Sequence, residues 1–404
     1  MPKRQFADDE ATAVQELDVG ENRDNYKTVV VNLLAALNRN LDKGIEEKMG
    51  LAGANTGNLI FVEAMKEQLD YVKEIWINPA ALKDVDNPSV VIPSANFMIQ
   101  GGDSLMAALI RFLENTDCPV TMAGLGAQAK LDETPEELVR KLSPTQTKAL
   151  KMLSERAVTI GVRGGYTAEC LSILGIKNVR IIGCPSFYYD FHKRPPKHKK
   201  PSLDRMQITV TPANPLETKI LEMGERHNAF WLMQMMTEHP DLALERDAWE
   251  DAWEELLTGS FPESGLSRAD IWKYMKRSAR IFFTKRDWDT FYEKEDITFA
   301  FGSRFHGNMA AFRKGVPALW IVHDARTKEL TEALHLPHID YAVWEKIEAP
   351  EELLGYCDYR EYRGKYRQMQ RQYTAFLEEN HLSHKLPSMN VLYRMKEHLT
   401  GKRM

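Results

Sequence analysis

The feature that most constrains this chain is the alternation of short apolar runs with amphipathic stretches. Runs such as "VVIP", "ANFMIQ", "PVTMAGLG", "VRIIG" and "QITVTP" have the length and composition of buried strands. Between them, "SLMAALIRFLENT", "SPTQTKALKMLSER" and "YTAECLSILGI" place apolar residues at helical spacing. Because strands that alternate with helices build parallel sheets covered on both faces, the pattern predicts an α/β fold.

A Pro- and Lys-rich segment, "FHKRPPKHKKPSLDR", divides the chain. It has almost nothing to bury and is typical of a linker. The length of 404 residues also favours two or three domains. We therefore expect a polar N-terminal tail, a first α/β domain, the linker, a second α/β domain and a charged helical segment, at residues 1–26, 27–190, 191–205, 206–355 and 356–404. The last segment either packs back across the domains or forms a solvated helical tail.

Composition narrows the functional classes. The chain is 43% hydrophobic and 27% charged, as ordinary globular proteins are, and its net charge of -5 gives no general affinity for nucleic acid or anionic lipid. The four scattered cysteines, Cys118, Cys170, Cys184 and Cys357, form neither a disulfide framework nor a metal-ligand spacing. With no signal-peptide core and no run of roughly 20 apolar residues, we expect a cytoplasmic protein. Peripheral membrane association and the oligomeric state stay open.

One segment, "FGSRFHGNMAAFRKGVPALWIVHDARTKEL", carries the clearest sign of a ligand site. It reads as strand, turn, helix and strand, with Arg304 and His306 at the first turn. In open α/β sheets, ligands bind at the carboxyl ends of the strands. Free N–H groups at a helix start favour an anion, and an Arg can hold a carboxylate or phosphate with two hydrogen bonds. The segment therefore predicts an anion site.

A similar arrangement occurs in the first half of the chain. Four turns, "GANTGN", "IQGGDS", "GLGAQ" and "GVRGGYT", are glycine-rich and lie at predicted strand ends, but none has the spacing of a Walker A loop or a dinucleotide fingerprint. In the last of them, Arg163 ends a strand and Thr167 is a predicted N-cap. Arg163 and Arg304 facing one cleft would bind a small dianion from two sides. The alternatives are plain turn chemistry and interdomain ion pairs.

Weaker candidates remain in the sequence. "RDWDT" contains the Asp-x-Asp pattern of metal-bound sugar nucleotides, but it also reads as a helix start. His335 and His338 have no partner set for a metal ion, and we expect no metal site. Asn55, Asn58 and Gln234 are polar residues at predicted strand ends, where they either bind sugar hydroxyls or serve turns and caps.

The segment "FGSRFHGNMAAFRKGVPALWIVHDARTKELTEALHLP" resembles the signature of the polysaccharide pyruvyl transferase family. That pattern is Gly-Ser/Thr-Arg-x-His-Gly, a short helix, Gly-x-Pro, a strand and Asp-x-Arg-Thr-x-Glu. "NTGN", "IQGGDSL", "GLGAQ" and "VRGGYTAECLSILGIKNVRIIGCPS" precede it in the family's order. The resemblance covers roughly Lys27 to Ile339. Asp103 stands where many relatives have a third glycine, and Gly164 and Cys184 stand where acids are common, which leaves the acceptor open.

The resemblance implies two Rossmann-like domains in a glycosyltransferase-B-like arrangement, with the site between them. It implies phosphoenolpyruvate as donor substrate, no cofactor, and a sugar of a surface polysaccharide, or of its lipid-linked oligosaccharide precursor, as acceptor. The product is a pyruvyl ketal. The implied donor-binding residues are Arg163, Ser303, Arg304, Phe305, His306 and Gly307, with Arg304 and His306 catalytic. Asn55, Asn58, Gln234, Asp324 and Arg326 are the acceptor-binding candidates.

Ketal formation requires a proton at the methylene carbon of phosphoenolpyruvate, and a His is the natural acid near neutral pH. We predict that His306 supplies it, with a pKa raised by the facing dianion. Two other functions fit the same pattern. One is a nucleotide-sugar glycosyltransferase in which Arg304 holds a diphosphate, and the other is a catalytically silent glycan-binding subunit of a polymer-assembly complex.

Overall fold

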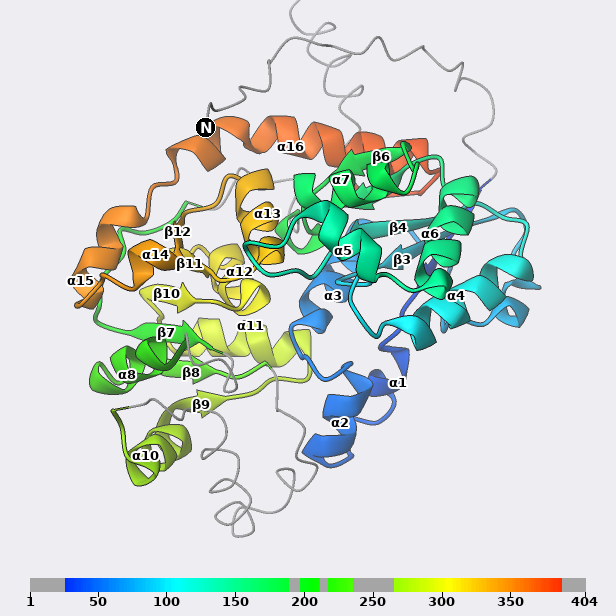
Figure 1. Cartoon of the computed structure of the whole chain (residues 1–404). Coiled ribbons are helices and arrows are strands. Elements are labelled where there is room, and N and C mark those ends of the chain that lie inside the picture. The colour runs from blue at the N-terminus through cyan, green and yellow to red at the C-terminus, as the bar shows by residue number, and fades with distance from the viewer. Residues whose placement is uncertain (1–25, 189–196, 211–216, 235–264, 387–404) are drawn as a thin grey trace, which may run out of the picture.

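The computed structural model describes residues 26–188, 197–210, 217–234 and 265–386, and it contains two six-stranded sheets whose strands all pair in parallel. Figure 1 shows the two sheets side by side, each with helices on both faces. The predicted fold class is confirmed: the chain is α/β, with two parallel six-stranded domains and a C-terminal helix.

The first sheet has the strand order β2-β1-β3-β4-β5-β6. Its strands are β1 (Lys27–Val31), β2 (Lys73–Ile75), β3 (Pro88–Pro93), β4 (Val120–Leu125), β5 (Ile160–Val162) and β6 (Val179–Ile181). The helices between them are α1 (Ala35–Asn38), α2 (Ile45–Leu51), α3 (Asn58–Gln68), α4 (Asp103–Glu114), α5 (Pro135–Lys141), α6 (Pro144–Arg156) and α7 (Gly165–Ile173), with 3-10 turns η2 (Pro79–Leu82) and η3 (Pro185–Phe187).

The second sheet has the order β12-β11-β10-β7-β8-β9, in which the strand order reverses between β7 and β10 as in dinucleotide-binding Rossmann domains. Its strands are β7 (Met206–Thr209), β8 (Phe230–Leu232), β9 (Ala279–Arg280), β10 (Phe299–Gly302), β11 (Ala318–Val322) and β12 (His338–Asp340). The helices are α8 (Thr218–Arg226), α10 (Arg268–Ser278), α11 (Lys285–Lys294), α12 (Phe305–Arg313), α13 (Ala325–Ala333), α14 (Tyr341–Trp344) and α15 (Pro350–Leu353), with η6 (Leu354–Tyr356).

Two local predictions are wrong. The apolar run at residues 95–100 is a loop with one isolated bridge, between Met98 and Ala127, which lies just after β4. Thr167 does not cap α7, because that helix begins at Gly165 and Thr167 lies inside its first turn. In both places a tertiary contact, rather than local periodicity, decides the conformation.

The C-terminal helix α16 (Arg360–Glu379) packs across both sheets, as Figure 1 shows along the upper edge of the molecule. Near its start, the Tyr359 hydroxyl accepts a hydrogen bond from Ala318 N of β11 at 2.7 Å. Near its end, Glu379 pairs with Arg180 of β6. Between them, Tyr373 donates to Gln68 of α3 at 2.6 Å. This helix therefore ties the two domains together.

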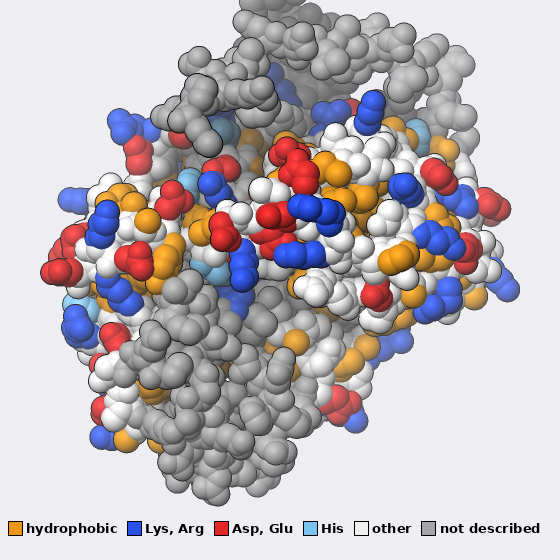
Figure 2. Space-filling model, in the orientation of Figure 1, with side chains coloured by type: hydrophobic (Ala, Val, Ile, Leu, Met, Phe, Trp, Pro, Cys, Tyr) orange, Lys and Arg blue, Asp and Glu red, His pale blue; other side chains and the backbone are white. Residues whose placement is uncertain are grey.

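Other predicted boundaries are kept as proposals. The N-terminal tail up to residue 25, residues 191–196 of the linker and residues 387–404 lie outside the described residues. Residues 197–205 contain neither helix nor strand, so we propose the domain boundary there. No helix among the described residues is long and apolar enough to cross a membrane. On the face in Figure 2, basic and acidic side chains are mixed over the described surface.

Candidate active site

A cavity of about 770 Å³ lies over the carboxyl ends of both sheets. In each sheet it lies beside the two strands between which the strand order reverses, β1 and β3 in the first sheet and β7 and β10 in the second. Ligands bind at this position in open α/β folds. The residues that follow β1 and β3 line it from the first domain, including Leu33, Leu34, Ala95 and Asn96. Arg304, which follows β10, lines it from the second domain.

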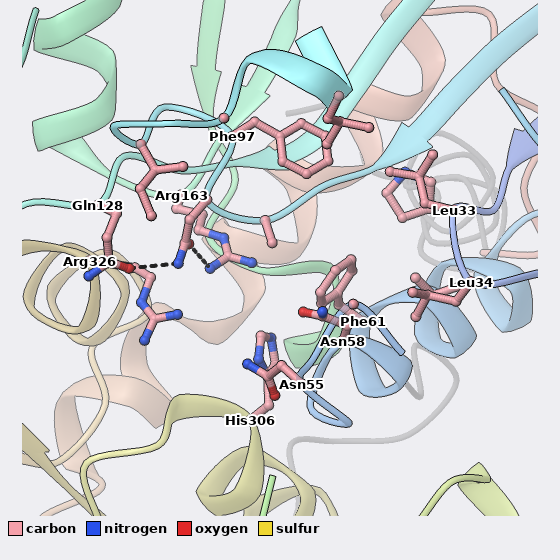
Figure 3. A pocket seen from close by; sticks show the side chains of 18 of the residues that line it. Leu33, Leu34, Asn55, Asn58, Phe61, Phe97, Gln128, Arg163, His306 and Arg326 are labelled. Carbon is pink, nitrogen blue, oxygen red and sulfur yellow. Dashed lines mark hydrogen bonds between the residues drawn. The ribbon is translucent and has the colours of Figure 1, made fainter. Parts of the chain in front are cut away.

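One half of the cavity is strongly cationic. Arg163, Arg304 and Arg326 line it, and the only carboxylate among the described residues of its lining is that of Asp324. Figure 3 shows Arg163, Gln128 and Arg326 together on one side of the pocket, with His306 rising between them and Asn55. This excess of guanidinium groups contrasts with the mixed charges on the outer surface in Figure 2.

Arg163 is fully buried and is held by neutral acceptors. Its Nε donates to the carbonyl of Gly124 at 2.9 Å, and one terminal nitrogen donates to the carbonyl of Ser94 at 3.3 Å. A Cβ at Gly126 would lie 2.6 Å from the Arg163 Cδ, so the glycine turn of "GLGAQ" makes room for this side chain. Burial, the largest cause, lowers the pKa of Arg163, and the nearby charge of Arg326 adds to the lowering. The group stays charged, because an Arg has an ordinary pKa above 12.

A chain of side-chain hydrogen bonds connects Arg163 to the second domain. Arg163 donates to Asn96 Oδ1 at 3.1 Å, and Asn96 donates to Gln128 Oε1 at 2.7 Å. Gln128 then donates to Asp324 Oδ2 at 2.8 Å. The amide orientations follow from this chain, because each amide must accept on one side and donate on the other. Part of it is drawn in Figure 3.

Arg304 is the least engaged of the three arginines. Its Nε is buried and makes no hydrogen bond within the described part of the chain. Burial, the largest cause, lowers the pKa of Arg304; Glu217 opposes this shift and Arg326 adds to it. The residue as a whole is only partly buried, but its buried Nε has no partner and would gain one from a ligand anion.

Asp324 and Arg326 belong to the Asp-x-Arg-Thr-x-Glu pattern, and the structure gives each a separate task. Asp324 caps α13 by accepting from the Thr327 N–H at 2.7 Å. Arg326 lies beside it, with 3.6 Å between its Nε and Asp324 Oδ2. Burial raises the pKa of Asp324, but Arg326 and His323 outweigh burial and hold it well below the ordinary value. The carboxylate therefore offsets part of the positive charge of Arg326.

His306 lies at the start of α12, where the cationic and apolar halves of the cavity meet. Its ring packs 5.4 Å from the Phe61 ring, and its Nε2 lies 3.4 Å from the Cys184 sulfur. Burial first, then the positive charges of Arg163 and Arg326, hold the pKa of His306 well below its ordinary value. The protein groups alone therefore favour a neutral imidazole, opposite to the raised pKa that we expected of a ligand-bound site.

The other half of the cavity is apolar. Its walls come from the loops after β1, β2 and β3 and from α2, α3 and α4, with an exposed Trp76 at the rim. The lining side chains are Leu33, Leu34, Leu51, Phe61, Val62, Trp76, Phe97, Ile99 and Leu105. Figure 3 shows Leu33 and Leu34 on the side away from Arg163, with Asn58 and Phe61 between. The site is therefore amphipathic.

Four predicted site residues do not line this cavity. Ser303 donates to the buried Glu217 at 2.6 Å, and Phe305 packs in the core with its carbonyl accepting from Trp320. Gly307 donates its N–H to Gln234 Oε1 at 3.2 Å. The Gly307 amide is therefore not free for an anion. The backbone carbonyl of Gln234 also accepts from the Thr56 N–H at 2.8 Å, so Gln234 connects α12 with the residues just before α3.

The structure brings the remaining predicted residues together and adds others. Asn55, Asn58, Arg163, Arg304, His306, Asp324 and Arg326 all line the cavity. Asn96, Gln128 and His323 also line it and were not predicted. Asn96 lies shortly after the end of β3. A search for polar residues just after predicted strands, the criterion that selects Arg163, misses Asn96 because residues 95–100 are themselves predicted as a strand.

Glu329 is the last residue of the Asp-x-Arg-Thr-x-Glu pattern. It forms hydrogen bonds between the two domains beside the site. Its two carboxylate oxygens accept from the N–H and hydroxyl of Thr167, at 2.9 and 2.7 Å, in the first turn of α7. Burial raises its pKa to about 7, against the lowering effects of these hydrogen bonds and of Arg163. A Cβ at Gly164 would lie 2.6 Å from the Glu329 Cβ and 2.8 Å from its carbonyl oxygen. Glycine at this position therefore permits the interdomain contact.

Gly164→Ala is expected to lower the free energy of unfolding by about 1–3 kcal/mol, because the added methyl group meets backbone that cannot move freely. The matched control is Gly165→Ala, one residue along, where a Cβ meets nothing within 4 Å. Chemical denaturation of both variants measures the difference. Equal stabilities would show that the contact at Gly164 does not hold the domains together.

The Asp-x-Asp segment serves structure. Asp287 donates its N–H to the Thr284 hydroxyl oxygen at 3.1 Å in an N-cap, and Asp289 lies between Lys285 and Lys314, with 2.9 Å to the second. His335 pairs with Glu361, and the described residues contain no group of acidic, His and Cys side chains that could hold a metal ion.

Comparison with solved structures gives distant likenesses. A functionally uncharacterised protein from Klebsiella pneumoniae is 11% identical, with a TM-score of 0.35 over 76% of this chain and 88% of that one. S. aureus MnaA in complex with UDP is 11% identical, with a TM-score of 0.34 over 93% and 97%. A trehalose-phosphate synthase from Burkholderia vietnamiensis is 7% identical, with a TM-score of 0.36 over 92% and 100%. No curated protein matches the sequence.

Comparison with family models gives one match, to the polysaccharide pyruvyl transferase model, over residues 55–243. The matched range includes Asn55, Asn96, Gln128 and Arg163, all of which line the cavity. It ends before the segment with Arg304 and His306, whose roles remain predictions. Residues 55–243 are thus similar to the polysaccharide pyruvyl transferase family.

Proposed function

We propose that this protein transfers the pyruvyl group of phosphoenolpyruvate to two hydroxyls of a saccharide, forming a ketal and releasing phosphate. The observation that carries the proposal is the convergence of Arg163, Arg304 and Arg326 with His306 on one cavity. Similarity to the pyruvyl transferase family over residues 55–243 supports the same reaction.

The charges of the donor match the cationic half of the cavity. Phosphoenolpyruvate carries a carboxylate and a phosphate, and among the described residues of the lining three guanidinium groups face a single carboxylate there. The buried Nε atoms of Arg304 and Arg326 both lack a hydrogen-bond partner within the described residues, but Arg326 has the Asp324 carboxylate 3.6 Å away, so Arg304 is the more suitable phosphate ligand. Arg163 is fixed by two backbone carbonyls and is suited to hold the second anionic group without reorganisation.

In this reaction His306, protonated once the donor is bound, gives its proton to the methylene carbon of phosphoenolpyruvate. The double-bond electrons form the new C–H bond, and positive charge develops on the neighbouring carbon. One acceptor hydroxyl adds to that carbon and loses its proton. The second hydroxyl replaces the phosphate, which leaves with one proton. The guanidinium groups stabilise the leaving phosphate throughout.

The apolar half of the cavity supports an acceptor with an apolar portion. Sugar hydroxyls need hydrogen-bonding partners, and Asn55 and Asn58 offer these near Phe61. Beyond them the walls are leucines and aromatic rings, which gain little from a further sugar but bind a hydrocarbon chain. A lipid-linked oligosaccharide therefore fits better than a free one.

The test is incubation of the protein with phosphoenolpyruvate labelled in its pyruvyl group, in the presence of lipid-linked or free oligosaccharides. We expect acceptor-dependent phosphate release and labelled saccharide, more with the lipid-linked form. A parallel incubation with labelled nucleotide sugars tests the glycosyltransferase alternative. Transfer from a nucleotide sugar, or binding of the glycan with no transfer from either donor, would refute the proposal.

Donor binding is expected to take up a proton. Without the donor, burial and the charges of Arg163 and Arg326 depress the pKa of His306. A bound dianion neutralises these charges and favours the imidazolium, so the pKa of His306 in the complex is higher than in the free protein. Because the complex binds more protons, the donor binds more tightly as pH falls, by up to about tenfold per pH unit between the two pKa values.

Calorimetry in buffers of different ionisation enthalpy counts the protons taken up. The phosphate of the donor also titrates near pH 6. His306→Gln is therefore the matched control, since it retains only the contribution of the phosphate. Equal proton uptake by the wild type and this variant would contradict the assignment.

A further inference from the structure

Cys184 contacts His306 from the opposite domain. It precedes η3 in the first domain, and its Sγ lies 3.4 Å from Nε2 of His306 on α12 of the second. The hydroxyl of Ser186 donates to the same sulfur at 3.0 Å. All three side chains are buried. The result is a continuous row of Ser186, Cys184 and His306.

The positions of the hydrogen atoms in this row can be inferred from Ser186, whose hydroxyl is the donor at one end. Since the Ser186 hydroxyl donates to Sγ, the single S–H bond of Cys184 is free to point at Nε2. Nε2 is then the acceptor, so the neutral ring carries its hydrogen on Nδ1. The tautomer of a His is set in this way by the hydrogen bond at its other nitrogen.

We propose that Cys184 is a positioning residue for His306, holding Nε2 so that the hydrogen on Nδ1 is the one delivered at the cavity. Because Nδ1 already carries a hydrogen in the neutral ring, the proton gained on donor binding enters at Nε2, where the S–H turns away and Sγ accepts the new N–H instead. Only the catalytic consequence rests on the proposed function; the contact itself does not.

The groups that face His306 from each neighbouring element are consistent with this role. The end of β5 presents Arg163 and α13 presents Arg326, and both charges oppose protonation. Helix α3 presents the uncharged ring of Phe61, and the segment before η3 presents Cys184. Among the described residues, no carboxylate contacts the His306 ring itself, and Asp324 pairs with Arg326 instead, at 3.6 Å. The negative charge therefore has to come with the donor.

The experiment is nitrogen NMR of His306 in the free protein, with its signal assigned by its loss in His306→Gln. We expect the wild type to show a neutral ring with hydrogen on Nδ1. Cys184→Ala should lose this tautomer preference, and Cys184→Ser, whose hydroxyl also donates, should restore it at least in part. Cys184→Asp should raise the pKa of His306 by about one unit or more.

The matched control is Cys170→Ala, the same change at a buried cysteine in α7 whose sulfur lies 3.9 Å from the Pro135 carbonyl. It should leave the His306 signals unchanged. In turnover, Cys184→Ala should lower kcat by roughly 10–100-fold with little change in KM for phosphoenolpyruvate, as for other groups that orient a reacting His. Absence of turnover in the wild type would refute the proposed function but not this contact.

A wild-type ring with hydrogen on Nε2 would overturn the proposal, as would His306 signals in Cys184→Ala that equal those of the wild type. If Cys184→Ala fails to fold, the wild-type tautomer and Cys184→Ser still decide the question.

Discussion

His306→Gln is expected to lower kcat by about 10²–10⁴-fold while changing donor affinity much less. Gln fills a similar volume and keeps a hydrogen-bonding group, but it cannot deliver a proton near neutral pH. A residue that only binds phosphate would behave differently, because its loss raises KM and kcat recovers at saturation. Steady-state kinetics with saturating phosphoenolpyruvate separate the two roles.

The control for this variant is His338→Gln, at the start of β12 on the outer edge of the second sheet. His338 bonds only locally among the described residues, with its Nδ1 2.8 Å from the Leu336 carbonyl. Its replacement should leave kcat at the wild-type level. Near-normal kcat in His306→Gln at saturating donor would remove His306 from the acid role.

Much of the site could be predicted because it follows from local rules. Arg163 and Arg304 were chosen because each follows a strand and precedes a helix, and both line the cavity. Asn55 and Asn58 also line the cavity, but not for the predicted reason, because Asn55 lies between α2 and α3 and Asn58 is the first residue of α3, and neither is at a strand end. Whether a residue lies at the carboxyl end of a parallel strand can be predicted from the sequence, because it depends only on the order of the strand and helix segments along the chain.

The errors concern residues whose partners are distant in sequence. Gly307 is a predicted donor-binding residue, but its amide donates to the side chain of Gln234, which follows β8. Gln128 belongs to the glycine-rich turn "GLGAQ", but its role in the site depends on its hydrogen bonds to Asn96 on one side and Asp324 on the other. Long-range hydrogen bonds of this kind have no local periodicity, so no pattern in the sequence predicts them.

The pKa of His306 illustrates the same limit. From the sequence, a His beside an Arg and an anion is expected to be a strong base. In the structure, burial and two guanidinium groups from other parts of the chain act on the ring first. The direction of a pKa shift depends on the three-dimensional distribution of charge, and here it implies that the acid is formed by donor binding.

The second large effect is expected from the arginines. Arg304→Ala should weaken phosphoenolpyruvate binding by about 2 kcal/mol or more, which is about 30-fold in Kd, because a charge-assisted hydrogen bond to the donor is lost. Since the buried Nε of Arg304 makes no hydrogen bond among the described residues, replacement of this side chain should not lower the free energy of unfolding. Arg163→Ala should weaken binding by a similar amount and also destabilise the fold, because it leaves the carbonyls of Gly124 and Ser94 without their donors.

The two variants together test whether the arginines hold the same group of the donor or, as proposed above, the phosphate and the second anionic group separately. If both arginines hold the same group, the double variant should lose less binding free energy than the sum of the losses in the two single variants. The reason is that the first substitution already lets that group shift away from the second arginine. Arg111→Ala, at an exposed position in the last turn of α4, is the control for loss of one positive charge and should leave Kd unchanged. Calorimetry gives each Kd, and chemical denaturation gives each stability. Unchanged donor affinity in both single variants would exclude a shared anion clamp, whereas additive losses would place the two arginines on separate groups.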